Sequence, residues 1–266
     1  MRTRIALAVL ALLPALPARA DDCAACTVKK LCAPHESADE AALKSAAPML
    51  KDKDLMTRRE GIDKLAASAS NHLNARSRKI SMEIARMLAD PESSVKGYAA
   101  EKLGEVGEEA IAVQSLSREA QNFEKALALE KPEKPDEKSE LAKWEEQERV
   151  LNSLYAGLAK TKSALAVAPL EKALRHSNPW VVRLAAENCH GFAGNRAIMK
   201  ALVDGLAKYY AAVVTKGNSA AWTAISMAMP LVSGCNDIPT QKDGGDAGRW
   251  NSDWQKWWRA NEKKLK

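Results

Sequence analysis

The sequence predicts an all-α protein, and three observations lead to that prediction. The chain has only 13 glycines among its 266 residues, and Ala, Leu, Lys and Glu, which form helices well, dominate it. Apolar residues recur at four-residue spacing, which places them on one face of a helix. A segment of this kind also repeats along the chain, so we expect an α-solenoid of stacked helical hairpins.

Residues 1–20 have the features of a secretory signal peptide. Arg2 and Arg4 precede an apolar run from Ile5 to Leu16, and Ala18-Arg19-Ala20 is a small-x-small cleavage signal. The apolar run is well below the roughly 20 residues that span a bilayer. We therefore expect cleavage near Ala20, export to the periplasm or the extracellular space, and no membrane-spanning segment.

The charge of the mature chain does not indicate a nucleic-acid partner. The net charge falls from +6 to +3 once the three arginines of the signal segment are removed, and residues of both signs are interspersed. Nucleic-acid binding normally requires a clustered basic surface. We expect the partner to be another exported or envelope protein, and the sequence favours no particular oligomeric state.

The internal repeat is clearest in two segments. Val95–Gly107 and Val182–Gly194 both follow the pattern V-[KR]-x-x-A-x-x-x-[LH]-G-x-x-G, and weaker copies precede and follow them. The four-residue spacing gives a narrow apolar stripe, on which the central alanine lets a neighbouring helix approach closely. We expect Gly104 and Gly191, the glycines of the [LH]-G pair, to end their helices.

Each of the two segments follows a short turn that contains proline. The turns are Asp90-Pro91 and Asn178-Pro179, in which the Asp or Asn side chain can cap a helix and the proline suits its first turn. A second apolar-periodic segment accompanies each copy of the repeat, so each repeat is predicted to be a helical hairpin. The second segments are Ile80–Leu88, Ala110–Leu129, Ala164–Leu174 and Ile198–Val214.

These segments resemble the HEAT-repeat family, in particular the short bacterial HEAT-like repeats that are also described as phycobilisome-lyase-like. The resemblance rests on LADPESSVKGYAAEKLGEVG (Leu88–Gly107) and SNPWVVRLAAENCHGFAG (Ser177–Gly194). It implies a HEAT/armadillo-like superhelix with a protein-binding surface, and it carries no catalytic residues over to this chain. The phycobilisome-lyase-like name also leaves lyase-like cofactor handling as an alternative.

One hairpin, at about residues 110–162, is longer than the others. Two amphipathic stretches flank KPEKPDEK, whose prolines Pro132 and Pro135 predict the turn. The two stretches can pair as an antiparallel, coiled-coil-like hairpin that projects from the stack. Lys131, Lys134 and Trp144 are its candidate contacts with a partner. The alternative is that the hairpin is only a solvated extension of one repeat.

The C-terminal residues are predicted to form a loop and a capping helix. The helix carries four tryptophans at i, i+4, i+7 and i+8, which lie on one face: Trp250, Trp254, Trp257 and Trp258. Because the last hairpin of a stack needs a cover, we expect these side chains to pack against it. An aromatic ligand platform and a helix in a membrane interface are the alternatives.

The chain has none of the common catalytic motifs. It lacks G-x-S-x-G, H-E-x-x-H and the P-loop pattern. Cys189 and His190 are neighbours, but adjacent helical side chains point about 100° apart, so we interpret both as buried packing residues. Met227 and Met229 are likewise interpreted as core filling rather than copper ligands. We expect neither enzyme activity nor a cofactor.

The remaining candidate site is Cys23-x-x-Cys26-x5-Cys32-x-x-His35. Export favours oxidation, so the first interpretation is a disulfide staple. Cys235 is expected to pair with one of these cysteines if the two ends of the chain approach each other. The cluster could also bind tetrahedral zinc, and unpaired or redox-active thiols are a third alternative.

The sequence therefore predicts a non-enzymatic, exported HEAT-repeat scaffold that mediates protein–protein interaction. The alternative is a metal-binding or thiol-redox protein that uses the cysteine cluster. The predicted organisation is a signal peptide (1–20), a cysteine-containing segment with the first helix (21–50), HEAT-like repeats (51–236), and a loop with the Trp-rich capping helix (237–266).

Overall fold

The computed structural model describes residues 31–70, 76–132, 138–216, 219–240 and 246–266. These residues contain eleven α-helices and no β-strand, which confirms the all-α prediction. The helices are α1 (Ala33–Ala46), α2 (Leu55–Ser70), α3 (Arg78–Arg86), α4 (Ser93–Val106), α5 (Glu109–Ala126), α6 (Lys138–Lys160), α7 (Val167–Leu174), α8 (Pro179–Asn188), α9 (Arg196–Lys216), α10 (Ala220–Ser233) and α11 (Ala247–Asn261).

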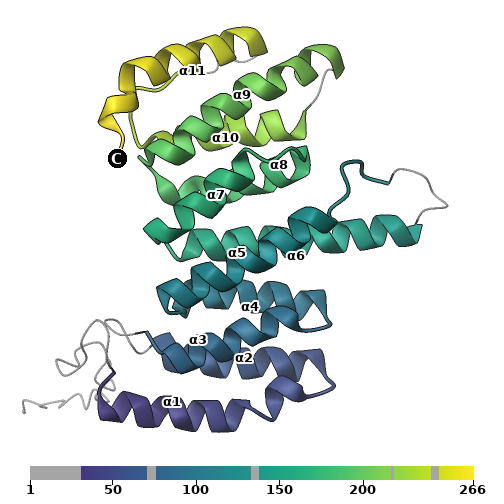
Figure 1. The fold of residues 1–266 in the computed structure, drawn as a ribbon, viewed down its shortest axis with the longest axis vertical. Coiled ribbons are helices and arrows are strands. Elements are labelled where there is room, and N and C mark those ends of the chain that lie inside the picture. Colours follow the sequence, from purple (N-terminus) through teal and green to yellow (C-terminus); the bar gives the residue numbers. More distant parts are fainter. Residues whose placement is uncertain (1–30, 71–75, 133–137, 217–218, 241–245) are drawn as a thin grey trace, which may run out of the picture.

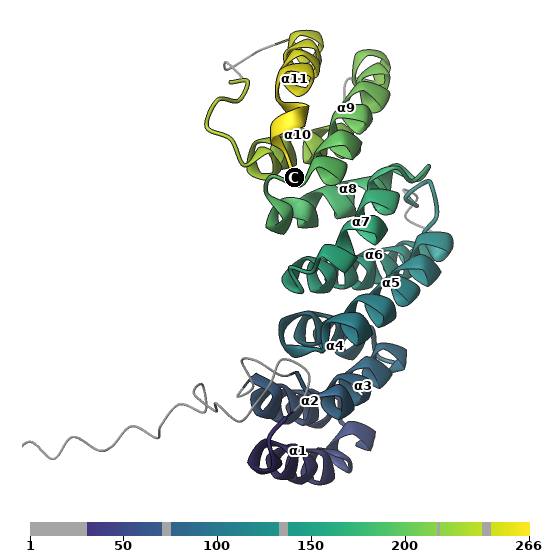
Figure 2. The same cartoon turned by 60° about the vertical axis from the view of Figure 1, so that its left-hand side comes forward.

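The helices stack along one long axis in chain order, with α1 at one end and α11 at the other (Figure 1). They form two layers. In the even layer, α2, α4, α6, α8 and α10 each pack on the next member, and the remaining helices form the odd layer. The stack is bowed in Figure 2, where α2, α4 and α10 lie toward its inner side.

The turns before α2, α4 and α8 repeat at the level of single hydrogen bonds. In each turn, a side-chain oxygen accepts from the backbone N–H two residues later, at 2.8 Å for Asp52, 2.8 Å for Asp90 and 2.9 Å for Asn178. This is the Asx turn, which Asp and Asn form readily. Asn178 caps α8, as predicted, but Asp90 lies two residues before the N-cap of α4, Glu92.

Asp90 has a second role that the sequence analysis did not predict. Its carboxylate forms an ion pair with Arg58 of α2, at 2.8 Å. The pair is buried, because the Arg58 side chain is 9% exposed and that of Asp90 is 4% exposed. The same guanidinium donates to the carbonyl oxygens of Asp52 and Lys53, at 2.9 Å and 3.1 Å. Arg58 therefore ties the turn before α2 to the turn before α4.

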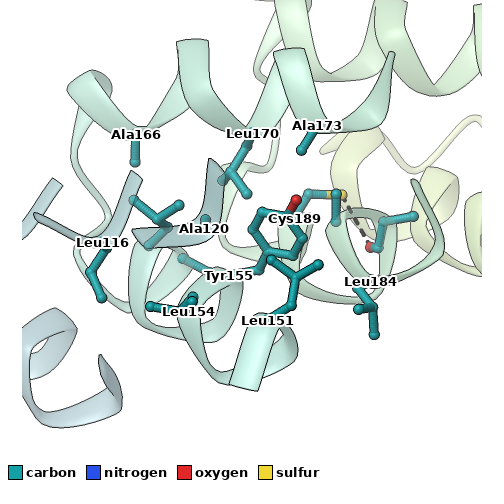
Figure 3. Close-up of a cluster of buried hydrophobic side chains, with 14 of the residues drawn as sticks. Leu116, Ala120, Leu151, Leu154, Tyr155, Ala166, Leu170, Ala173, Leu184 and Cys189 are labelled. Atoms are coloured by element: carbon teal, nitrogen blue, oxygen red, sulfur yellow. Dashed lines mark hydrogen bonds between the residues drawn. The ribbon is translucent and has the colours of Figure 1, made fainter. Parts of the chain in front are cut away.

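The core runs continuously between the two layers. Figure 3 shows its central part, where Leu116 of α5, Leu154 of α6 and Leu170 of α7 meet and are fully buried. The one hydroxyl in this cluster, that of Tyr155, donates to a carboxylate oxygen of Glu124 at 2.7 Å. The Cys189 thiol donates to the carbonyl oxygen of Ala186, so the polar groups of Tyr155 and Cys189 in this otherwise apolar cluster both have partners.

The prediction that Gly104 ends its helix is wrong. Helix α4 continues through Gly104 to Val106, and a Cβ atom on Gly104 would lie 2.1 Å from the carbonyl oxygen of Gly157 in α6. The glycine is therefore needed for close helix packing and not for chain reversal. Gly191 does not end α8 either, because it lies in a short 3-10 turn after α8 has ended at Asn188.

Helices α5 and α6 form the long hairpin predicted at about residues 110–162. The start of α6 extends beyond the edge of the stack (Figure 1), but the helix then runs between α4 and α8 as a member of the even layer. Most of the hairpin is therefore integral to the stack.

The C-terminal end of the stack is covered by α11, which packs on α9. Its four tryptophans are buried, and Trp254 contacts Trp250 and Trp257 edge to face, with ring centroids 5.7 Å and 5.2 Å apart. The last residue, Lys266, exchanges backbone hydrogen bonds with Gly194 and Arg196. These contacts fix the end of the chain against the turn before α9.

Candidate functional site

The solvent-facing surface of the even layer carries ion pairs that join one helix to the next. Lys160 of α6 lies 2.8 Å from Glu101 and 2.9 Å from Glu105 of α4. Although partial burial opposes the shift, hydrogen bonds to these carboxylates raise the pKa of Lys160. Because Lys160 of α6 neutralises carboxylates of α4 in this way, the charged groups of this part of the surface already have partners within the protein.

A polar groove of about 470 Å³ lies between α4 and α6. Arg59 and Arg149 line it and donate to the backbone carbonyls of Ser94 and Glu145. Tyr98, also in the lining, donates its hydroxyl hydrogen to Asp63, and burial together with this carboxylate raises the pKa of Tyr98 to about 12. The groove has many polar groups, so a hydrated or charged ligand would suit it better than an apolar one.

A second groove, of about 510 Å³, lies between α8 and α10 and is mostly apolar. On α10, Met227 and Leu231 are 72% and 61% exposed, although both side chains are large and apolar. With Thr223 they form one stripe at four-residue spacing, and none of the 14 residues of α10 is charged. Alanines line the rest of the groove: Ala186, Ala220, Ala224 and Ala228.

The α8 side of this groove carries charged groups. Arg183 pairs with Glu148 of α6 and lies 3.6 Å from Glu187, so one cation serves two carboxylates. Desolvation raises the pKa of Glu187; Arg183 opposes this shift, and Glu148 adds to it. Arg183 and Glu187 line the groove, and because Arg183 also pairs with Glu148 of α6, the three groups together carry one net negative charge.

The three candidate contacts of the long hairpin differ in their surroundings. Trp144 is only 3% exposed, its ring lies 5.1 Å from that of Trp180 in α8, and its indole N–H donates to the carbonyl oxygen of Ala128. Lys131 is at the surface, over the Trp144 ring. Lys134 lies outside the described residues. Trp144 therefore anchors the hairpin on α8, and its burial removes it from any surface that a partner could contact.

The cysteine cluster is described only in part, because Cys23 and Cys26 lie outside the described residues. Cys32 Sγ lies 3.3 Å from Nδ1 of His35, across the first turn of α1. Within the described part of the chain, no group of three or more His, Cys, Asp or Glu side chains is arranged to hold a metal ion.

Cys235 follows α10 and is a free thiol. Cys32 directly precedes α1, and α1 and α10 lie toward opposite ends of the stack (Figure 1). Stacking in chain order therefore separates Cys235 from Cys32. The predicted pairing of Cys235 with Cys23 or Cys26 lies outside the described residues and stays a prediction.

Cys189 and His190 do not form a catalytic pair. Cys189 is buried in the core, its Sγ donates to the carbonyl oxygen of Ala186, and burial raises the pKa of its thiol to about 12 (Figure 3). His190 is exposed, so the prediction of a buried His190 is wrong. Helix α8 ends before His190, which therefore cannot occupy the position of Leu103 in the repeat.

The exposure of Met227 differs from the prediction that it fills the core. Met229 is fully buried, as expected of a core residue, but Met227 two positions away points outward. The signal was present in the sequence, because Thr223, Met227 and Leu231 form their own stripe, separate from the stripe of Ile225, Met229 and Val232. Apolar residues on a second face of a helix indicate that this face also packs against an apolar surface.

No protein-family model matches the chain, and no curated protein matches it at a significant level. Among the described helices, none combines the length and the apolar character that crossing a membrane requires.

Proposed function

We propose that the protein is a non-enzymatic, exported scaffold, built as a HEAT-like α-solenoid, that binds another exported or envelope protein on the surface of its even layer. The observation that carries this proposal is the uncovered apolar stripe of α10, formed by Met227 and Leu231 beside the α8–α10 groove. Contiguous exposed apolar surface on a soluble protein commonly marks an interaction site.

The repeat architecture supports the same proposal. The hairpins stack in two layers, the Asx turns recur before α2, α4 and α8, and α11 covers the last hairpin. Stacks of this kind give long surfaces that are used for binding, and they need a cap at the end. The predicted signal segment supports export of the chain.

Quantitative affinity capture from the exported fraction tests the proposal. The bait is the wild-type protein, compared with M227E/L231E and with a matched control, L165E/V214E. The control also replaces exposed large apolar side chains, but Val214 lies on α9 of the odd layer and Leu165 in the turn before α7. A partner recovered near one-to-one with the wild type and the control, and lost with M227E/L231E, supports the scaffold. Equal recovery with all three baits contradicts binding by this surface.

A second candidate function, metal binding or thiol exchange at the N-terminal end, is supported by the contact between Cys32 and His35. Thiolate and imidazole are both good zinc ligands. The intact mass of the exported protein, measured under native conditions and after alkylation without reductant, tests it. A metal-sized mass increment with all five thiols alkylated favours this function, whereas an unchanged native mass with three or fewer alkylated thiols favours a disulfide.

A further inference from the structure

The shape of the α8–α10 groove fits a helix. Small alanines form its lining, while Met227 and Leu231 project from one wall at a spacing of one helical turn. The large side chains form a ridge, and the small alanines leave a groove beside it. A second helix can pack its own ridge of side chains into such a groove. An amphipathic helix with apolar residues at i, i+3 or i+4, and i+7 would place its stripe here in the same way.

The carboxylate of Glu187 in the lining of the groove indicates which charge the occupant should carry. Glu187 shares Arg183 with Glu148, and the Arg183 guanidinium also lies over the ring of Trp180, 5.3 Å from its centroid. The opposite wall, α10, contributes no charge, and His190 is the remaining titratable group in the lining. Among the described residues that line the groove, Arg183 is the one cation, so a Lys or Arg of the occupant would supply a counter-charge for Glu187.

The same charge disfavours two other occupants. Two copies of this chain facing each other through α10 would bring together two rims with excess negative charge, which costs free energy because like charges repel. A bilayer surface with anionic headgroups would also be repelled by Glu187, and the basic flank of interfacial helices is absent from α10.

We infer that the α8–α10 groove binds one amphipathic helix of the partner, with its apolar stripe against Met227 and Leu231 and a Lys or Arg paired with Glu187. The inference rests on the proposed function and narrows it to one groove and one kind of partner segment. It predicts specificity from charge as well as affinity from apolar burial.

The test uses a display library of random peptides of about 16 residues, enough for four helical turns. The library is selected on the full-length wild-type protein and counter-selected on M227E/L231E. The expected enrichment is an apolar stripe at helical spacing with a Lys or Arg at its edge. Enriched peptides should bind E187K about tenfold more weakly, and peptides with that basic residue changed to Glu should bind E187K better than wild type.

Several outcomes would overturn the inference. Enriched peptides without a basic residue, or equal binding to wild type and E187K, would show that Glu187 does not pair with a basic residue of the occupant. Self-association in sedimentation that M227E/L231E abolishes would identify a second copy as the occupant, and flotation with phosphatidylcholine or phosphatidylglycerol vesicles would identify a lipid surface. Because Glu187 is partly exposed, E187K should fold as the wild type does, which circular dichroism checks.

The two proposals can fail separately. If affinity capture loses the exported partner with M227E/L231E but the selected peptides lack the predicted pattern, the scaffold stands and the helical, basic partner segment is wrong. If the capture shows no dependence on M227E/L231E, the proposed use of this surface fails, whatever peptides the groove selects.

Discussion

A Cβ atom on Gly104 of α4 would lie 2.1 Å from the carbonyl oxygen of Gly157 in α6, and one on Gly157 would lie 2.4 Å from the carbonyl oxygen of Ala100. The two backbones are thus in direct contact, and they lie too close together for a side chain to fit between them. This contact sets the spacing of the central pair in the even layer, and with it the width of the polar groove above them.

Replacing Gly104 with Ala should destabilise the protein by about 3 kcal/mol or more, because the new methyl group meets backbone atoms that cannot move without separating two helices. Gly97→Ala in the same helix is the matched control. There the new Cβ meets the side chain of Ser153 at 3.0 Å, which can rotate away. Urea denaturation should show a large loss for the first variant and at most about 1 kcal/mol for the second.

Arg58→Met should cost about 3–5 kcal/mol, because it leaves the carboxylate of Asp90 buried without its cation. Arg59→Met, at the next position of α2, is the control: this half-buried side chain donates to the carbonyl oxygen of Ser94 and lies over the ring of Tyr98, so its removal leaves no buried carboxylate without a cation. Its effect should stay near or below about 1 kcal/mol. Thermal melting of both variants checks the difference, and similar losses would show that the Arg58–Asp90 pair does not join the repeats.

Trp144→Ala should destabilise the protein by about 3–5 kcal/mol, since the ring fills the contact between α6 and Trp180 of α8. Lys131→Ala removes an exposed cation over that ring together with its surface ion pair with Glu145, and should cost less than about 1 kcal/mol. Denaturant titration measures both values. A neutral Trp144→Ala would mean that the hairpin is not anchored on α8 and that Trp144 could again face a partner.

The Cys189 thiol should resist alkylation in the folded protein. Burial raises its pKa from 9.0 to about 12, so the folded state favours the protonated form and the reactive thiolate is scarce at neutral pH. This contribution to stability is complete below about pH 9 and is lost as the pH rises toward 12.

Iodoacetamide at pH 8, followed by mass spectrometry, measures this reactivity. Cys235, which is only partly buried, should be modified in the native protein, and Cys189 only after unfolding. Equal rates at the two positions under native conditions would contradict the buried position of Cys189.

The sequence was informative where a local pattern decides the structure. The four-residue spacing around Val95, Ala99 and Leu103 predicted a buried helical stripe, and all three side chains are fully buried. The Asn178-Pro179 turn likewise predicted the start of α8, because an Asn cap and a first-turn proline act within a few residues.

It was not informative where the outcome depends on distant partners. Gly104 is followed by a chain reversal, and only the position of Gly157, far along the chain, shows that the glycine serves packing instead. Trp144 looks available on an amphipathic helix, yet Trp180 of the next even helix covers it. The α8–α10 groove combines residues from two hairpins. The stripe of Thr223, Met227 and Leu231 indicates one of its walls, but only the packing of α8 against α10 shows that a groove forms there.

The most direct test of the central claim, that the even layer binds a partner through α10, is photo-crosslinking in the exporting cell. A benzoylphenylalanine is placed at Met227 and, as the control, at Val214 of α9, which is also highly exposed. Our account predicts a crosslink to one exported protein from position 227 and none from position 214. No crosslink from position 227, or the same products from both positions, would contradict it.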